Sequence, residues 1–95
     1  MKAYKVVLVN PMGFYDEEKY FLNKKLAIKK YQDKLDELKI IRKVETSEEQ
    51  EVIEGLDDRI IKRNLLMIWE KISCGFDEWE LRPFYLELKE IEIQN

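Results

Sequence analysis

The stretch TSEEQEVIEGLDDRIIKRNLLMIWEKI, residues 46–72, decides the fold, because it combines helix-start signals with the longest apolar run of the chain. Its first residues form two overlapping capping boxes, which satisfy free amides at a helix start: Thr46 with Glu49 and Ser47 with Gln50. Apolar residues then recur at helical spacing and end in the run 65–69. We therefore expect a helix over 46–72, and a buried strand over 65–72 is the alternative.

Another helix is expected before this stretch, over residues 24–39. Asn23 is a favourable N-cap, because its side-chain oxygen accepts a hydrogen bond from a free backbone amide. The apolar positions recur at spacings of four, four and three residues, as in an amphipathic helix: Ala27, Tyr31, Leu35 and Leu38. Both helices are expected to pack on a sheet, through core residues Ala27, Tyr31, Leu35, Leu56, Ile60, Leu65 and Ile68.

The two ends of the chain have strand patterns. Residues 1–9 carry apolar side chains on both faces, which is typical of an interior strand, and the turn residues 10–13 (NPMG) end it. Residues 20–22 are either a short strand or the approach to the first helix. Apolar and polar residues alternate over 83–93, with a slip of one residue at 89–90 that indicates a β-bulge.

These elements predict a single α+β domain over residues 1–95. The expected sheet is small, mixed or antiparallel, with the N- and C-terminal strands as neighbours, and is covered by two helices. The single cysteine, Cys74, cannot form an internal disulfide, and no secretory pattern opens the chain, so we expect a cytoplasmic location. No apolar run approaches the roughly 20 residues that span a bilayer, so no membrane partner is expected.

The composition gives little support to catalysis. The chain has no histidine, which is the commonest general base and metal ligand, and its 3 glycines are too far apart for a phosphate-binding loop. The remaining enzyme hypothesis is a small magnesium nuclease, because Glu87-Leu88-Lys89 resembles part of the PD-(D/E)xK motif and Asp77 could add an acid. Charges on a solvated strand face explain the same residues, so we expect no enzyme, no cofactor and no metal.

Basic side chains concentrate on the helix expected over residues 24–39. They lie away from its apolar stripe and form a basic face: Lys24, Lys25, Lys29, Lys30 and Lys34. Such a face could contact the phosphates of a nucleic acid, which gives an alternative function as a nucleic-acid-binding protein. A face that is simply solvated by water is the plainer explanation.

Acidic side chains concentrate over residues 44–58, where seven occur without any Lys or Arg. One or two carboxylates favour the N-terminal end of a helix dipole, and the others exceed that need, so either solubility or docking to a protein explains them. Trp79 and Tyr85 are of types that dominate interface hot spots. We predict a partner protein with a basic surface, bound through Glu48, Glu49, Glu51, Glu54, Asp57, Asp58, Trp79 and Tyr85.

Three segments resemble small accessory proteins of bacteriophages and prophages: MKAYKVVLVN, YFLNKKLAIKKYQDKL and PFYLELKEIEIQN. The resemblance implies a non-enzymatic binder of host machinery, a class that includes inhibitors of defence proteins and DNA mimics, acting in the bacterial host cytoplasm. The expected function is therefore a non-catalytic protein-binding module, such as a phage-type inhibitor of a host nucleic-acid-handling or defence protein. The sequence leaves the partner's identity and homo-oligomerisation open.

Overall fold

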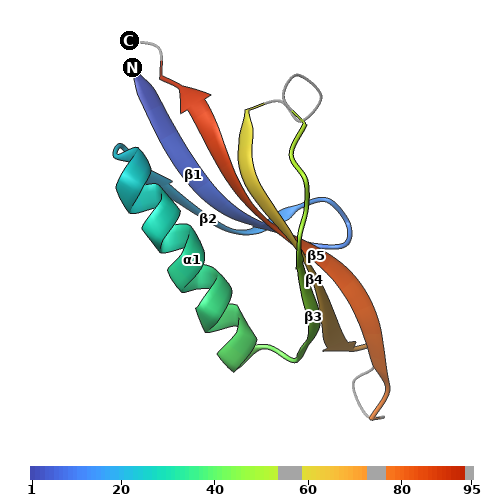
Figure 1. Cartoon of the computed structure of the whole chain (residues 1–95). Coiled ribbons are helices and arrows are strands. Elements are labelled where there is room, and N and C mark those ends of the chain that lie inside the picture. Colours follow the sequence, from blue (N-terminus) through green and yellow to red (C-terminus); the bar gives the residue numbers. More distant parts are fainter. Residues whose placement is uncertain (54–58, 73–76, 94–95) are drawn as a thin grey trace.

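The computed structural model describes residues 1–53, 59–72 and 77–93, which form one antiparallel sheet and one helix (Figure 1). The strand order across the sheet is β2-β1-β5-β4-β3, so β1 and β5, the two terminal strands, are neighbours as predicted. The elements are β1 (Lys2–Val9), β2 (Tyr15–Phe21), α1 (Lys24–Ile41), β3 (Val44–Glu49), β4 (Ile60–Lys71) and β5 (Trp79–Glu92). The α+β class and the antiparallel sheet are thus confirmed.

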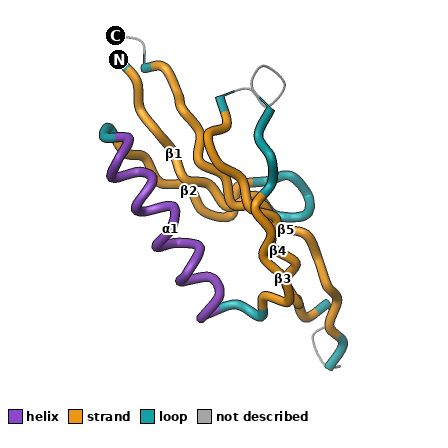
Figure 2. Tube along the Cα trace, viewed as in Figure 1, coloured by secondary structure: helices purple, strands orange, loops and turns teal. Residues whose placement is uncertain are grey.

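The helix lies against one side of the sheet, and the strands curve past its C-terminal end (Figure 2). The molecule is elongated, with extents of 50 × 24 × 23 Å. The start of β1 and the end of β5 lie together at one end, while the end of β4 and the start of β5 project beyond α1 at the other (Figure 1). One layer of helix therefore covers only one face of this long sheet.

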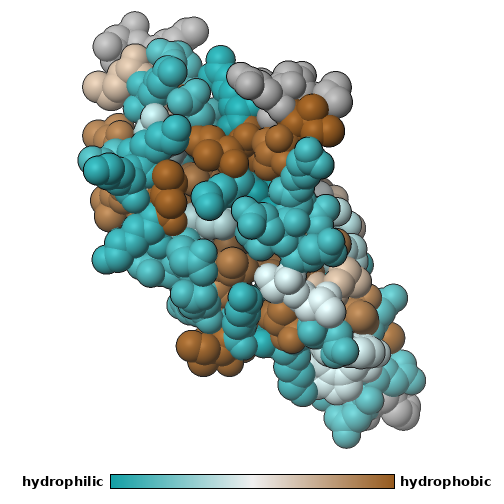
Figure 3. Space-filling view, viewed as in Figure 1, coloured by the Kyte–Doolittle hydropathy of each residue, from teal (hydrophilic) through white to brown (hydrophobic). Residues whose placement is uncertain are grey.

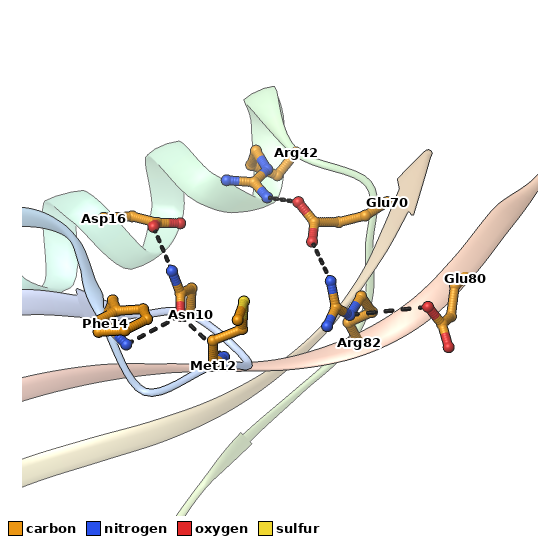
Figure 4. A network of polar contacts seen from close by, with 8 residues as sticks. All are labelled: Asn10, Met12, Phe14, Asp16, Arg42, Glu70, Glu80 and Arg82. Carbon is orange, nitrogen blue, oxygen red and sulfur yellow. Dashed lines mark hydrogen bonds and ion pairs between the residues drawn. The ribbon is translucent and has the colours of Figure 1, made fainter. Parts of the chain in front are cut away.

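The turn between β1 and β2 follows the expected chemistry. Gly13 has a φ of 88°, the left-handed region that glycine favours, and its amide donates to the Asn10 carbonyl over 2.9 Å. The side-chain oxygen of Asn10 also accepts from the amides of Met12 and Phe14, at 2.9 and 3.0 Å (Figure 4). The segment 20–22, which the sequence left open, belongs to a strand except for its last residue. This strand, β2, begins five residues before the segment.

Helix α1 begins where predicted and runs two residues beyond the predicted end. The Asn23 side chain accepts from the amide of Leu26 over 3.0 Å, which confirms the N-cap. At the other end, the Arg42 guanidinium reaches Glu70 of β4 over 3.2 Å, and Arg82 of β5 contacts the same carboxylate over 3.9 Å (Figure 4). These contacts join the end of the helix to the β4–β5 hairpin.

The helix predicted over 46–72 is wrong, because its described residues form β3 and β4 instead. Arg59, just before β4, has a φ of 60°, which an α-helix does not accommodate. β4 pairs with β3 on one side and β5 on the other, so tertiary strand pairing overrides the local helix signals of Thr46 and Ser47. The alternative strand over 65–72 was the correct one, since β4 covers all but its last residue.

The prediction of a bulge at 89–90 is wrong, because the bulge lies on the neighbouring strand. β5 pairs with β1 in unbroken register from Tyr85 to Glu92. The irregularity is in β4, where the register shifts between Ile60 and Lys62, opposite the 88–89 segment of β5. The extra residue, Ile61, packs against the core.

The core lies between α1 and the sheet. The predicted residues Ala27, Tyr31, Leu35 and Ile68 are buried in it, whereas Ile60 and Leu65 are only partly buried and Leu56 lies outside the described residues. The largest fully buried side chains on the covered face come from the three central strands and the helix: Leu8, Leu38, Leu66, Ile68, Phe84, Leu86 and Leu88. The core is therefore built by β4 as a strand, with Leu66 in the place that the helical pattern gave to Leu65.

One polar link crosses this core. The Tyr31 hydroxyl donates to the Leu86 carbonyl over 3.0 Å and lies within hydrogen-bonding distance of the side-chain oxygen of Asn64. Burial raises the pKa of Tyr31 well above its usual value, and the carboxylates of Glu49 and Glu87 add to the effect. The link therefore holds α1 in a fixed position over β4 and β5.

Candidate functional site

The face of the sheet opposite α1, here called the open face, is covered by no helix or strand among the described residues (Figure 1). Because strand side chains alternate between faces, every strand residue next to a core residue points to the open face. On β4 these residues include Leu65, Met67 and Trp69, which alternate with the buried Leu66 and Ile68. The open face is thus apolar along β4, whereas a sheet face exposed to water usually carries polar residues.

An apolar patch spans β4 and β5 on the open face. Leu65 pairs with Tyr85, Met67 with Pro83, and Trp69 with Leu81. Paired residues in an antiparallel sheet point to the same face, so these side chains are direct neighbours. With Trp79 one pair further along, the apolar patch consists of Leu65, Met67, Trp69, Trp79, Leu81, Pro83 and Tyr85.

The two tryptophans of the patch are anchored but remain accessible, with 37% of Trp69 and 41% of Trp79 exposed. The Trp69 indole N–H donates to a Glu45 carboxylate oxygen over 2.9 Å. The Lys43 ammonium lies 3.8 Å from the centre of the Trp79 ring, a close cation–π contact. Both ring orientations are therefore constrained by contacts within the chain.

A charged cluster adjoins the patch on β2, β4 and β5. Glu87 is only 7% exposed and accepts from the Arg63 guanidinium over 2.8 Å, while the Lys89 ammonium lies 3.6 Å from its other oxygen. Lys89 also donates to the Tyr15 hydroxyl over 2.9 Å. The carboxylate is thus neutralised by two cations, and it stabilises the charges of both.

The predicted binding residues separate into groups. Trp79 and Tyr85 lie at the two ends of the apolar patch, and Glu48 pairs with Leu65 beside Tyr85, so these three share the open face. Glu49 pairs with Asn64 and points to the helix side, and Glu51 follows β3 in an exposed segment. The predicted residues Glu54, Asp57 and Asp58 lie outside the described residues.

Sequence reasoning missed five patch residues: Leu65, Met67, Trp69, Leu81 and Pro83. The helical pattern placed the first on the core side and treated 65–69 as surrounded on all sides. Alternation along a strand would have assigned 65, 67 and 69 to one face, and this was the signal available in the sequence.

The nuclease hypothesis placed Glu87 and Lys89 on one strand face, and they do share it. Asp77, however, lies before β5 near its other end, and its carboxylate contacts Lys71 at 3.6 Å. Among the described residues, no group of three or more acidic or sulfur side chains could hold a metal ion. The structure therefore does not bring the three residues of the motif together.

The basic face of α1 is partly neutralised. The Lys34 ammonium contacts Glu17 of β2 at 2.7 Å and Glu37 at 3.2 Å. The other four lysines make no ion pair in the described part of the chain and are exposed: Lys24, Lys25, Lys29 and Lys30. They form a solvated surface on the far side of the molecule from the apolar patch.

The surface seen from the side of Figure 1 is mostly hydrophilic, and hydrophobic side chains form separate patches on it (Figure 3). No helix in the described residues is long and apolar enough to cross a membrane. Comparisons with protein families, curated proteins and solved structures find no match to this chain.

Proposed function

We propose that this chain is a non-catalytic protein-binding module whose apolar patch docks on another protein. The observation that carries the proposal is that seven apolar or aromatic side chains adjoin on a sheet face that no described helix or strand covers. Contiguous exposed apolar surface of this kind marks interaction sites in soluble proteins. Tyrosine, tryptophan, methionine and arginine are also the types enriched in interface centres, and all four occur in or beside the patch.

The acidic edge strand supports a partner with basic side chains at the border of this contact. Glu48, Glu49 and Glu51 make no ion pair among the described residues. Since β3 is a strand, a helix dipole does not account for these carboxylates. Charged edges also discourage strand pairing between copies, and this protection is compatible with docking. A Lys or Arg of the partner placed over Glu48 would lie directly beside Leu65.

The biological role that we propose is inhibition of a basic, nucleic-acid-handling host protein, in the manner of phage accessory proteins. The support is the acidic sheet edge together with the resemblance of the terminal segments to such proteins. Charge complementarity of this kind accelerates association and selects among partners. Nucleic-acid binding through α1 is the competing function.

The test begins with affinity capture from host lysate to identify a partner, followed by calorimetry with the purified pair. Trp79→Ala removes an exposed patch residue and is expected to weaken binding at least about tenfold, as hot-spot truncations do. The matched control is Ile40→Ala, which truncates an exposed apolar residue of α1 that is 84% accessible. Equal affinity of the Trp79 variant and the native protein would contradict the proposal, and binding of oligonucleotides that is lost on neutralising Lys24 and Lys25 would favour the competing function.

A further inference from the structure

The open face carries a second feature beside the apolar patch, where two lysines oppose each other across neighbouring strands. Lys5 of β1 pairs directly with Lys89 of β5. Like charges in directly opposed positions destabilise a sheet. A carboxylate or a polar residue at position 5 would remove this repulsion, so the pair is unfavourable for folding unless something else neutralises it.

The described residues do not provide that neutralisation for Lys5. Its ammonium makes no ion pair in the described part of the chain and lies 4.9 Å from the centre of the Tyr15 ring. Lys89 lies 5.4 Å from the same ring and donates to the Tyr15 hydroxyl over 2.9 Å. Both ammonium groups therefore converge on the face and the edge of one aromatic ring.

The nearby carboxylates are already engaged. Glu87 is shared between Arg63 and Lys89, as described above. Glu18 of β2 accepts a hydrogen bond from the Tyr20 hydroxyl and pairs with Val7 rather than with Lys5. Among the described residues, no carboxylate forms an ion pair with Lys5, while Glu87 is already paired with Lys89.

The cluster lies over a buried residue of β1. Val7 follows Lys5 on the open side of β1, pairs with Glu87 and is completely buried. Partial burial by itself lowers the pKa of Lys89, but its bonds to Tyr15 and Glu87 outweigh that effect and raise it. Lys89 thus remains a cation in a fixed position at neutral pH.

We propose that Lys5, Lys89 and Tyr15 form a binding site for an anionic oxygen group, a phosphate or a carboxylate. An anion between the two ammonium groups would accept a charge-assisted hydrogen bond from each and would remove their mutual repulsion. The Tyr15 hydroxyl has one proton that it can donate to the same anion, because it already accepts from Lys89. The site does not depend on the proposed protein-binding function and lies beside the apolar patch.

The test uses NMR spectroscopy of the ¹⁵N-labelled protein, titrated separately with inorganic phosphate and with acetate at constant ionic strength. We expect saturable chemical-shift changes at the backbone amides of residues 5, 15 and 89. Tighter binding of phosphate would identify a dianion as the preferred ligand, and tighter binding of acetate would identify a carboxylate. Lys5→Gln is expected to weaken binding about tenfold, the loss typical of one charge-assisted hydrogen bond. Tyr15→Phe keeps the ring, removes the hydroxyl and is expected to weaken binding by a smaller factor.

The matched control is Lys29→Gln, which removes one exposed lysine charge on α1 and is expected to leave the affinity unchanged. Preserved signal dispersion in each variant shows that the fold is intact. Shifts that do not saturate, that are equally large at the α1 lysines, or that persist with full affinity in Lys5→Gln would overturn the proposal.

Discussion

The two faces of this sheet are built from the same five strands and have opposite characters. On the covered face, side chains such as Leu66 and Leu86 are fully buried under α1, and the one polar link, from Tyr31, is satisfied. On the open face, Leu65, Met67 and Trp69 form an apolar surface with nothing described above it. The first face buries the core, and the second keeps apolar side chains partly exposed. The difference shows where to look for function in a chain without a catalytic motif.

Truncating a side chain of the covered face is expected to have the largest effect on stability. Leu66→Ala is expected to lower the free energy of unfolding by about 2–5 kcal/mol, since it removes a fully buried side chain and leaves a cavity. Leu65→Ala, its neighbour on the open face, is expected to lower it by about 1 kcal/mol or less, because this side chain is only partly buried. Urea denaturation of both variants measures the contrast. Equal losses would mean that the two faces are equally important for folding.

Removing the polar link of the covered face is expected to have a smaller effect. Tyr31→Phe leaves the Leu86 carbonyl and the Asn64 side chain without this hydrogen-bond partner, which is expected to lower the free energy of unfolding by about 1–3 kcal/mol. A loss below about 0.5 kcal/mol in chemical denaturation would show that the link contributes little beyond its packing.

The same link predicts a pH dependence. The pKa of Tyr31 is raised above its unfolded value of 10.0, so the folded state retains this proton longer than the unfolded state does. The stability that results is fully present below pH 10.0 and is lost as the pH rises through the folded pKa. The stability difference between the native protein and Tyr31→Phe should therefore narrow above pH 10.0, and denaturation curves at pH 8 to about 11 measure it. A constant difference would contradict the assignment.

The N-cap of α1 is expected to contribute less to stability than the buried side chains of the covered face. Asn23→Ala removes the acceptor for the Leu26 amide and is expected to lower the free energy of unfolding by about 1 kcal/mol. Asn23→Ser retains an acceptor and serves as the control. If the two variants are equally destabilised, the cap hydrogen bond is not the reason that the helix begins here.

Neutralising the acidic edge is expected to have the smallest effect on folding. The triple variant Glu48→Gln, Glu49→Gln and Glu51→Gln removes three exposed carboxylates that make no ion pair among the described residues. We expect a change in stability within about 0.5 kcal/mol, in line with other surface substitutions. The association rate with a basic partner should fall. Thermal denaturation and stopped-flow mixing with the captured partner measure these effects, and an unchanged association rate would remove the acidic edge from the interface.

Local chemistry predicted about half of the fold. The N-cap at Asn23, the turn at Gly13 and the terminal strands were readable, because each depends on residues close together in the sequence. The region 46–72 was not predictable in this way, because its capping boxes and helical spacing favour a helix. The pairing of β4 with β3 and β5 overrides these local signals, and only the tertiary structure reveals that pairing. The same error concealed part of the site. Trp79 and Tyr85 were recognised from their residue types, whereas Met67 and Trp69 could be recognised only from the two-residue alternation of a strand.

The central claim is that the apolar patch of the open face binds a protein, and methyl NMR of the protein bound to its captured partner tests it most directly. We expect the methyl signals of Leu65, Met67 and Leu81 to shift or broaden on binding, while those of the buried Leu66 and Leu88 change little. Both groups belong to neighbouring strands, so each serves as a reference for the other. Shifts confined to Leu22, Leu26 and Ile40 near and on α1, with Leu65, Met67 and Leu81 unaffected, would contradict the account.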